Sequence, residues 1–222
     1  APLVAEFGAG ARREDAREEV CRRLSLDARL PLVLVMGGGE GLGRLEEITG
    51  RLSALEELKP QVVVVTGRNA RLRRRCERLA RQTGGVRVRV LGWTERVPEL
   101  MRASDILVSK LGTTFDEALA CELPIVALEP PPGTERTQYR LLEEWGTGRA
   151  ARSLDELAAT VARLLTHTDE LEAMRAKARE LRKTDAAPRV ARWISEETRR
   201  RGEPRNHAKR HEDEPSRLAV VV

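Results

Sequence analysis

Aromatic residues and cysteines are scarce in this 222-residue chain, and each shortage excludes a class of function. Aromatics make up 3% of the residues, which argues against the stacking surfaces that bind single-stranded nucleic acid. The cysteines, Cys21, Cys76 and Cys121, form no Cys-x-x-Cys pair. We therefore expect a reducing compartment and no zinc site. The three histidines do not cluster with cysteines or carboxylates, so we expect no bound metal. Because aromatic residues are scarce, we also expect no nucleic-acid partner.

Long apolar runs are also missing. No run approaches the roughly 20 residues of a membrane-spanning helix, and no secretory leader is visible. The chain begins at Ala1 rather than at a Met, so we expect it to be part of a longer protein. The net charge of +5 permits contact with phosphates or anionic lipid without choosing between them. Much of the arginine is interleaved with glutamate, which is typical of solvated helical faces.

A glycine-rich turn after a strand is the most informative segment that is present. Residues 32–36 form an unbroken apolar run, typical of a strand buried on both faces of a parallel sheet. Five of the next seven residues are glycine, and residues 45–58 follow with helical spacing. Such a turn presents free N–H groups and the positive end of a helix dipole to a phosphate or diphosphate. The alternative is a tight turn that binds no ligand.

Two known phosphate-binding loops do not match this turn. A P-loop requires Lys and Ser or Thr after its last glycine, whereas Arg44 and Leu45 stand there. A dinucleotide fingerprint requires Gly-x-Gly-x-x-Gly and an acidic residue after the next strand, but that strand ends in Thr66-Gly67-Arg68. A nicotinamide-dependent oxidoreductase is therefore disfavoured. The glycines are expected to serve another nucleotide or a nucleotide sugar.

Strands and helices alternate along the chain, which predicts an α/β fold with a doubly wound, Rossmann-like parallel sheet. The predicted strands are 32–36, 61–66, 86–91, 105–108, 124–128 and a short one near residue 150. Helices are predicted at 12–24, 45–58, 70–81 and 97–103, then after residues 109–114 and through Cys121, and at 135–145, 154–165, 169–181 and 187–200. We expect a linker and leading helix over 1–31, a nucleotide-sugar-binding domain over 32–182, a C-terminal helix over 183–200 that packs back on the first domain, and a disordered tail over 201–222.

Ligands of such folds bind beyond the carboxyl ends of the strands. Five loops at these ends form the candidate site: 37–43, 66–69, 92–93, 110–117 and 131–135. Glycine amides suit a diphosphate, Glu117 can accept both ribose hydroxyls, Trp93 can wall a base, and Thr134-Glu135 can bind sugar hydroxyls. Each residue also has a purely structural explanation: a helix-dipole partner for Glu117 and core packing for Trp93. The sequence shows no Ser-His-Asp set or metal-binding carboxylate cluster.

These segments resemble a known family. The matching phrases are Val35–Gly41, Thr66–Asn69, Ser104–Lys110, Glu117–Leu119, Leu123–Ile125 and Pro132–Glu135. In their order and spacing they are similar to plant-type monogalactosyldiacylglycerol synthases of glycosyltransferase family 28, which have the two-domain GT-B fold and are relatives of the peptidoglycan N-acetylglucosaminyltransferase. The resemblance covers roughly residues 1–193 and corresponds to the C-terminal, donor-binding half of that family.

The resemblance implies inverting transfer of a hexose, galactose in the first place, from a UDP-sugar to diacylglycerol, with no cofactor. It also implies that the acceptor site, the catalytic base and the peripheral membrane contact belong to an N-terminal domain outside this chain. The location would be the plastid envelope in a photosynthetic eukaryote, or otherwise the cytoplasmic face of a bacterial membrane. The implied donor contacts are Gly38, Gly39 and Gly41 with the diphosphate, Arg68 and Trp93 with the uracil, Lys110 and Thr114 with the phosphates, Glu117 with the ribose, and Thr134 and Glu135 with the sugar.

The chain departs from the family pattern at several positions. The loop after Lys110 is one residue shorter, Thr134 replaces a Gln and Gln138 an Asn. Glu122 replaces a helix-ending Gly, at a cost on the order of 1 kcal/mol if its backbone is left-handed. Three alternatives therefore stay open: a degenerate, non-catalytic nucleotide-sugar-binding domain, a relative that transfers N-acetylglucosamine, and a module whose basic segment 68–81 binds nucleic acid or an anionic membrane.

Overall fold

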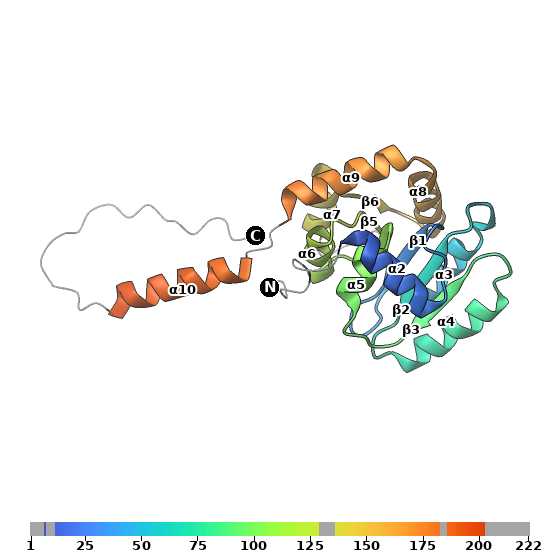
Figure 1. Ribbon diagram of the computed structural model, residues 1–222, viewed down its shortest axis with the longest axis horizontal. Helices are drawn as coiled ribbons and strands as arrows, with labels where there is room; N and C mark the ends of the chain where they lie inside the picture. The colour runs from blue at the N-terminus through green and yellow to red at the C-terminus, as the bar shows by residue number, and fades with distance from the viewer. Residues whose placement is uncertain (1–6, 8–11, 129–135, 183–185, 203–222) are drawn as a thin grey trace, which may run out of the picture. The chain divides into compact units, whose positions relative to one another are not determined.

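The computed structural model describes residues 7, 12–128, 136–182 and 186–202. Within these residues, six strands form one parallel sheet with helices on both faces (Figure 1). The spatial order of the strands is β3-β2-β1-β4-β5-β6. Their bounds are β1 Leu32–Met36, β2 Gln61–Val65, β3 Val88–Leu91, β4 Ile106–Ser109, β5 Ile125–Leu128 and β6 Gly148–Ala151. The predicted α/β class with a doubly wound parallel sheet is confirmed.

The helices also lie close to their predicted positions. Their bounds are α2 Arg13–Leu24, α3 Leu45–Ser53, the 3-10 turn η1 Glu56–Leu58, α4 Ala70–Gln82, α5 Val97–Ala103, α6 Thr113–Ala120, α7 Arg136–Glu144, α8 Leu154–Thr166, α9 Thr168–Leu181 and α10 Ala186–Gly202. The single helix expected over 45–58 is wrong, because α3 ends at Ser53 and η1 follows. The left-handed backbone of Lys59, with φ 46°, then ends η1.

The alternating side chains of β1 separate two apolar layers. Leu34 and its neighbours on one face join a core with α2, α5, α6 and α7. Val33 and Val35 face the other way, into a core with α3, α4 and α8. All three side chains are fully buried. Burial on both faces explains why the strand is an unbroken apolar run rather than an alternating one.

The leading helix α2 is fixed to the amino end of the sheet by the carboxylate of Asp105, the residue before β4. This carboxylate accepts hydrogen bonds from the backbone N–H of Leu32 at 2.8 Å and from Nη1 of Arg17 at 3.0 Å. Arg13 also pairs with it, at 2.5 Å. Arg17 further donates to the carbonyl of Ala103 at 2.8 Å. The ion cluster therefore ties α2, α5 and two strands together, and α2 packs along α5 (Figure 1).

The chain divides into two compact units, residues 1–186 and residues 187–222. Nearly all of α10 falls in the second unit and supplies the helix expected near the C-terminus. The expected packing of this helix on the first domain, as the final helix does in GT-B folds, stays a prediction. Over the described residues, no helix combines the length and the apolar character needed to cross a bilayer.

Candidate functional site

The candidate site lies where the strand order reverses, between β1 and β4. In doubly wound sheets the crevice at this switch point is the usual ligand site. A pocket of about 390 Å³ lies at this place and receives residues from the turns after β1, β2 and β3 and from the first turns of α6. We call it the switch-point pocket. It brings together five of the predicted site residues: Gly38, Gly39, Trp93, Thr114 and Glu117.

The turn after β1 is locked against the turn after β2. The backbone N–H of Arg68 donates to the carbonyl of Gly39 at 2.7 Å. Gly67 has φ +61°, and a Cβ at this position would lie 2.1 Å from the Gly39 oxygen. Only glycine permits such a close approach of two backbones. The contact holds Gly38, itself at φ +69° and exposed, at the wall of the pocket.

Gly41 is placed differently from Gly38 and Gly39. It is buried, and a Cβ on it would lie 2.5 Å from the carbonyl oxygen of Thr66. It is not among the residues that line the pocket. In the structure Gly41 therefore serves the packing of the two turns, and its implied contact with a diphosphate stays a prediction.

Trp93 and Arg68 form a stacked pair at the pocket. The guanidinium carbon of Arg68 lies 3.7 Å from the centroid of the indole ring, within cation–π distance. Trp93 is 54% exposed, so the alternative explanation of its presence as core packing is wrong. The missing side chain of Gly39 leaves the ring room, because a Cβ there would lie 3.3 Å from Trp93 Cζ3. The pair presents a flat, cationic surface of the kind that suits a nucleobase.

The helix that begins at the pocket is α6, whereas the sequence pattern pointed to α3. Helix α6 starts after Gly112, which has φ 134°, and no side chain caps it. Thr113, Thr114 and Glu117, all from its first turns, line the pocket. Uncapped first-turn N–H groups and the positive end of the dipole favour an anion here. By contrast, residues 44–47 at the start of α3 are not part of the lining.

Glu117 is a partly buried carboxyl group in this wall. Burial, and to a smaller extent the charge of Asp116, raises the pKa of Glu117. A desolvated carboxylate gains when hydroxyl groups donate to it. Glu117 can therefore act as an acceptor for a polar ligand in the pocket.

Three of the described predicted residues, Gly41, Arg68 and Lys110, are not in the lining, although Arg68 stacks on Trp93, which does line the pocket. Lys110 is exposed directly after β4 and is not among the pocket residues. Thr134 and Glu135 lie outside the described residues. In α7, Gln138 Nε2 donates to the carbonyl of Gly112 at 3.3 Å, while the buried Oε1 of Gln138 has no hydrogen-bond partner. Gln138 thus supports the loop that leads into α6.

Several lining residues were missed by sequence reasoning. Thr94 and Glu95 follow β3 directly, so the strand-end rule that selected Trp93 also covers them. Phe7 lines the pocket as well, but it lies in a segment without a periodic pattern that would signal it. Over the described residues, no group of three His, Cys, Asp or Glu side chains is placed to hold a metal ion.

Comparisons with known proteins agree with this geometry. Residues 33–167 match the family "Glycosyl transferases group 1". The chain is 33% identical over 200 residues to monogalactosyldiacylglycerol synthase 2, chloroplastic, of Arabidopsis thaliana, covering 86% of this chain and 42% of that protein. It is 29% identical over 164 residues to the processive diacylglycerol beta-glucosyltransferase of Bacillus subtilis, covering 73% and 42%. The resemblance to plant-type synthases is confirmed.

Solved structures agree on the fold. Acinetobacter baumannii MurG superposes with a TM-score of 0.70 at 18% identity, over 86% of this chain and 55% of that chain. Anabaena Alr3699/HepE, solved with UDP-glucose, gives 0.67 at 15% identity, over 89% and 56%. The neighbours are GT-B glycosyltransferases. The chain spans about two-fifths of the two curated relatives and just over half of these solved chains.

Proposed function

The chain belongs to the group 1 glycosyl transferases, and we propose that it is the donor-binding half of an enzyme that transfers a hexose from a UDP-sugar to diacylglycerol. Galactose is the first candidate, because two of the relatives at 33–36% identity are named monogalactosyldiacylglycerol synthases and three others probable ones. Glucose is the second, because the Bacillus relatives at 29% are named glucosyltransferases.

The observation that carries this proposal is the meeting of three recognition elements in the switch-point pocket. The Arg68–Trp93 pair supplies a surface for the uracil. Glu117 supplies a carboxylate to which the ribose hydroxyls can donate. Gly38, Gly39 and the uncapped start of α6 supply backbone N–H groups for the diphosphate. These are the three parts of a UDP group.

The same groups would assist the chemistry. When the glycosidic bond to UDP breaks, negative charge grows on the β-phosphate. Fixed N–H dipoles at the start of α6 stabilise that charge without having to reorganise. Lys110, exposed at the end of β4, is proposed to add its positive charge. The proposed reaction therefore uses no cofactor other than the sugar donor.

The proposal places three functions in a part of the enzyme outside this chain. They are binding of the acceptor, removal of its proton by a base, and contact with the membrane. Diacylglycerol is proposed as the acceptor because the relatives' names carry it. The plant relatives are named chloroplastic, which supports the plastid envelope as one location. The cytoplasmic face of a bacterial membrane is the other.

Calorimetric titration of the chain with UDP, UDP-galactose, UDP-glucose, UDP-N-acetylglucosamine and NADH tests the donor role. We expect the uridine ligands to bind and Glu117→Ala to weaken their binding about tenfold or more. Asp116→Ala is the matched control, because Asp116 is the neighbouring carboxylate on α6, exposed and outside the pocket lining.

The remaining outcomes separate the alternatives. NADH binding without UDP binding would indicate an oxidoreductase. Binding of UDP with no preference among the three sugars would favour a non-catalytic domain. Absence of uridine binding by a chain with a cooperative unfolding transition would contradict the proposal.

A further inference from the structure

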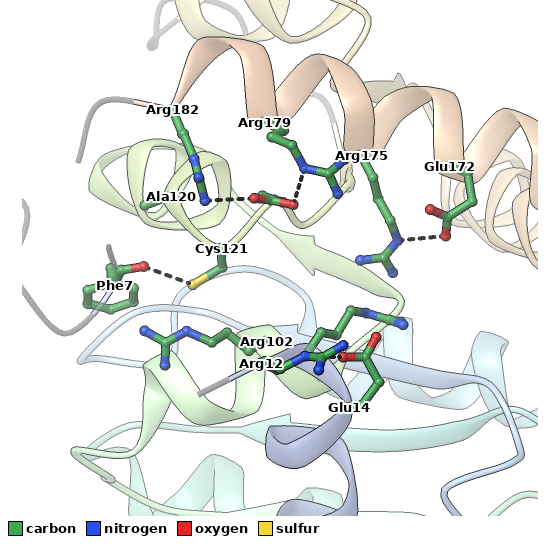
Figure 2. Close-up of a pocket in the computed structure, with 12 residues that line it drawn as sticks. Phe7, Arg12, Glu14, Arg102, Ala120, Cys121, Glu172, Arg175, Arg179 and Arg182 are labelled. Carbon is green, nitrogen blue, oxygen red and sulfur yellow. Dashed lines mark hydrogen bonds and ion pairs between the residues drawn. The ribbon is translucent and has the colours of Figure 1, made fainter. Parts of the chain in front are cut away.

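A second cavity, of about 350 Å³, lies among α2, α5, α6 and α9 (Figure 2). It is close to the amino ends of the strands, because its residues Arg13 and Arg175 both contact Asp105, which precedes β4. Its charged lining consists of six arginines, Arg12, Arg13, Arg102, Arg175, Arg179 and Arg182, and three glutamates, Glu14, Glu122 and Glu172. We call it the arginine cavity. Its position and charge differ from those of the switch-point pocket, although Phe7 borders both.

Arg175 carries its charge in the protein interior. It is 4% exposed, and its Nη2 donates to the backbone carbonyls of Ser104 and Asp105 at 3.3 and 2.9 Å. Its Nε makes no hydrogen bond, and the Glu172 carboxylate lies 3.2 Å away. Burial, reinforced by the nearby Arg13 charge, lowers the pKa of Arg175 to about 10. The lining as a whole carries six arginines against three glutamates, and Asp105, 3.6 Å from Nη2 of Arg175, adds one more carboxylate.

One further feature adds to the positive potential. Helix α2 begins at Arg13 without a side-chain cap, so the positive end of its dipole lies at the cavity wall. Cys121 also lines the wall, and burial raises the pKa of its thiol to about 12. The thiol therefore contributes no negative charge at neutral pH.

The arginines reach the cavity from opposite sides. Figure 2 shows Arg179 and Arg182 extending from α9 toward Glu122, while Arg102 lies across the space from them. Each guanidinium has five N–H donors, and Glu122 occupies only part of the donors of Arg179 and Arg182. Guanidinium groups on several sides of one space are suited to the oxygens of a phosphate.

We propose that the arginine cavity binds a phosphate-bearing anion, as a second ligand site apart from the switch-point pocket. Its volume lies within the roughly 300–1,000 Å³ of small-ligand pockets, which leaves room for a phosphomonoester rather than a bare phosphate alone. Such an anion comes either from a soluble metabolite or from a lipid headgroup. The inference does not depend on the proposed transferase activity.

Titration of the full chain with inorganic phosphate and with glycerol 3-phosphate, in a buffer free of other multivalent anions, tests the site. We expect Arg102→Gln to weaken binding about tenfold or more. Arg179→Gln, at a more exposed position on α9, provides a second variant should the first fail to fold. Arg74→Gln on the solvated face of α4 removes the same charge outside the cavity and is expected to bind as the parent chain does.

Two results would overturn the proposal: no phosphate binding by the parent chain, or equal loss in the Arg74 control. UDP titration of the same variants keeps the two proposals separate, since Arg102→Gln should leave UDP binding unchanged. Sedimentation with phosphatidylcholine vesicles, with and without phosphatidic acid, then identifies the source. Binding that requires both phosphatidic acid and Arg102 indicates a headgroup, and binding of the soluble anions alone indicates a metabolite.

Discussion

At the carboxyl end of the sheet the switch-point pocket is held in place by close contacts between backbone turns, whereas at the amino end the arginine cavity is built from long side chains. The first depends on Gly41 and Gly67, whose missing side chains let two turns meet. The second depends on guanidinium groups anchored by Asp105, Glu122 and Glu172. Different substitutions should therefore damage them: an added methyl group at one end, a removed charge at the other.

The largest effect is expected from Gly67→Ala at the backbone-built end. The new Cβ would lie 2.1 Å from the Gly39 oxygen at φ +61°. Both the clash and the left-handed backbone oppose the substitution, so the free energy of unfolding should fall by about 3 kcal/mol or more. Urea unfolding measures this loss. Gly84→Ala is the control, because its Cβ would meet nothing within 4 Å and its φ is not left-handed; a similar loss there would contradict the explanation.

The next effect is expected from Asp105→Asn at the charged end. Loss of this carboxylate leaves Arg13 and Arg17 without their shared anion in a partly buried position. Breaking such a cluster is expected to cost about 2–4 kcal/mol. The measurement is again urea unfolding. The control is Asp155→Asn, whose pair with Arg51 is exposed and should contribute less than about 1 kcal/mol.

Glu122 combines a left-handed backbone with ion pairs, and its substitution should change the free energy of unfolding by less than the two substitutions above. Its backbone is left-handed, with φ +55°, as the comparison with a helix-ending Gly suggested it would be. Its carboxylate pairs with Arg179 at 2.8 Å and Arg182 at 2.7 Å. Glu122→Gly and Glu122→Ala both remove the ion pairs, but only Gly relieves the backbone. The Gly variant should therefore be the more stable by about 1 kcal/mol, measured by thermal unfolding; equal stabilities would mean that the backbone is not strained.

These cases show which parts of the molecule were predictable from the sequence. The strands were, because the apolar runs such as Val62–Val65 have no other stable place than the interior of a parallel sheet. The strand-end rule then located Trp93 and Glu117 in one pocket. The basic segment predicts a solvated face for α4, and its ion pairs, Arg73 with Glu77 and Arg75 with Glu46, fit that prediction.

Features that depend on contacts between distant segments were not predictable. Arg68 stacks on Trp93 only because the turns after β2 and β3 lie side by side. Gly41 was expected at the ligand, but whether a glycine faces a ligand or a neighbouring backbone depends on how two loops meet. The arginine cavity combines residues from α2, α5, α6 and α9, and none of these segments has a motif that announces it.

The smallest expected effect concerns Glu117, where the ligand function opposes stability. Because burial raises its pKa, the folded chain favours the protonated carboxyl, and ionisation lowers the free energy of unfolding as the pH rises through the folded-state pKa. Glu117→Gln removes this cost, so the variant should unfold at a slightly higher temperature than the parent at neutral pH. The difference should shrink as the pH falls below the unfolded-state pKa, where the parent side chain is also neutral.

The same variant should bind UDP more weakly at neutral pH, because an amide is a poorer acceptor for two ribose hydroxyls than a carboxylate is. Parent binding should also weaken on acidification, at a higher pH than an ordinary Glu would give, whereas binding by the variant should not follow that titration. Asp116→Asn is the control for both measurements. It removes an exposed carboxylate from the first turn of the same helix, which forfeits a dipole interaction but also relieves part of the repulsion that raises the pKa of Glu117, so stability should change little and UDP binding at neutral pH should stay intact. A gain in stability without a loss of binding would assign Glu117 no part in the site, and a loss of both would make it a structural residue of α6.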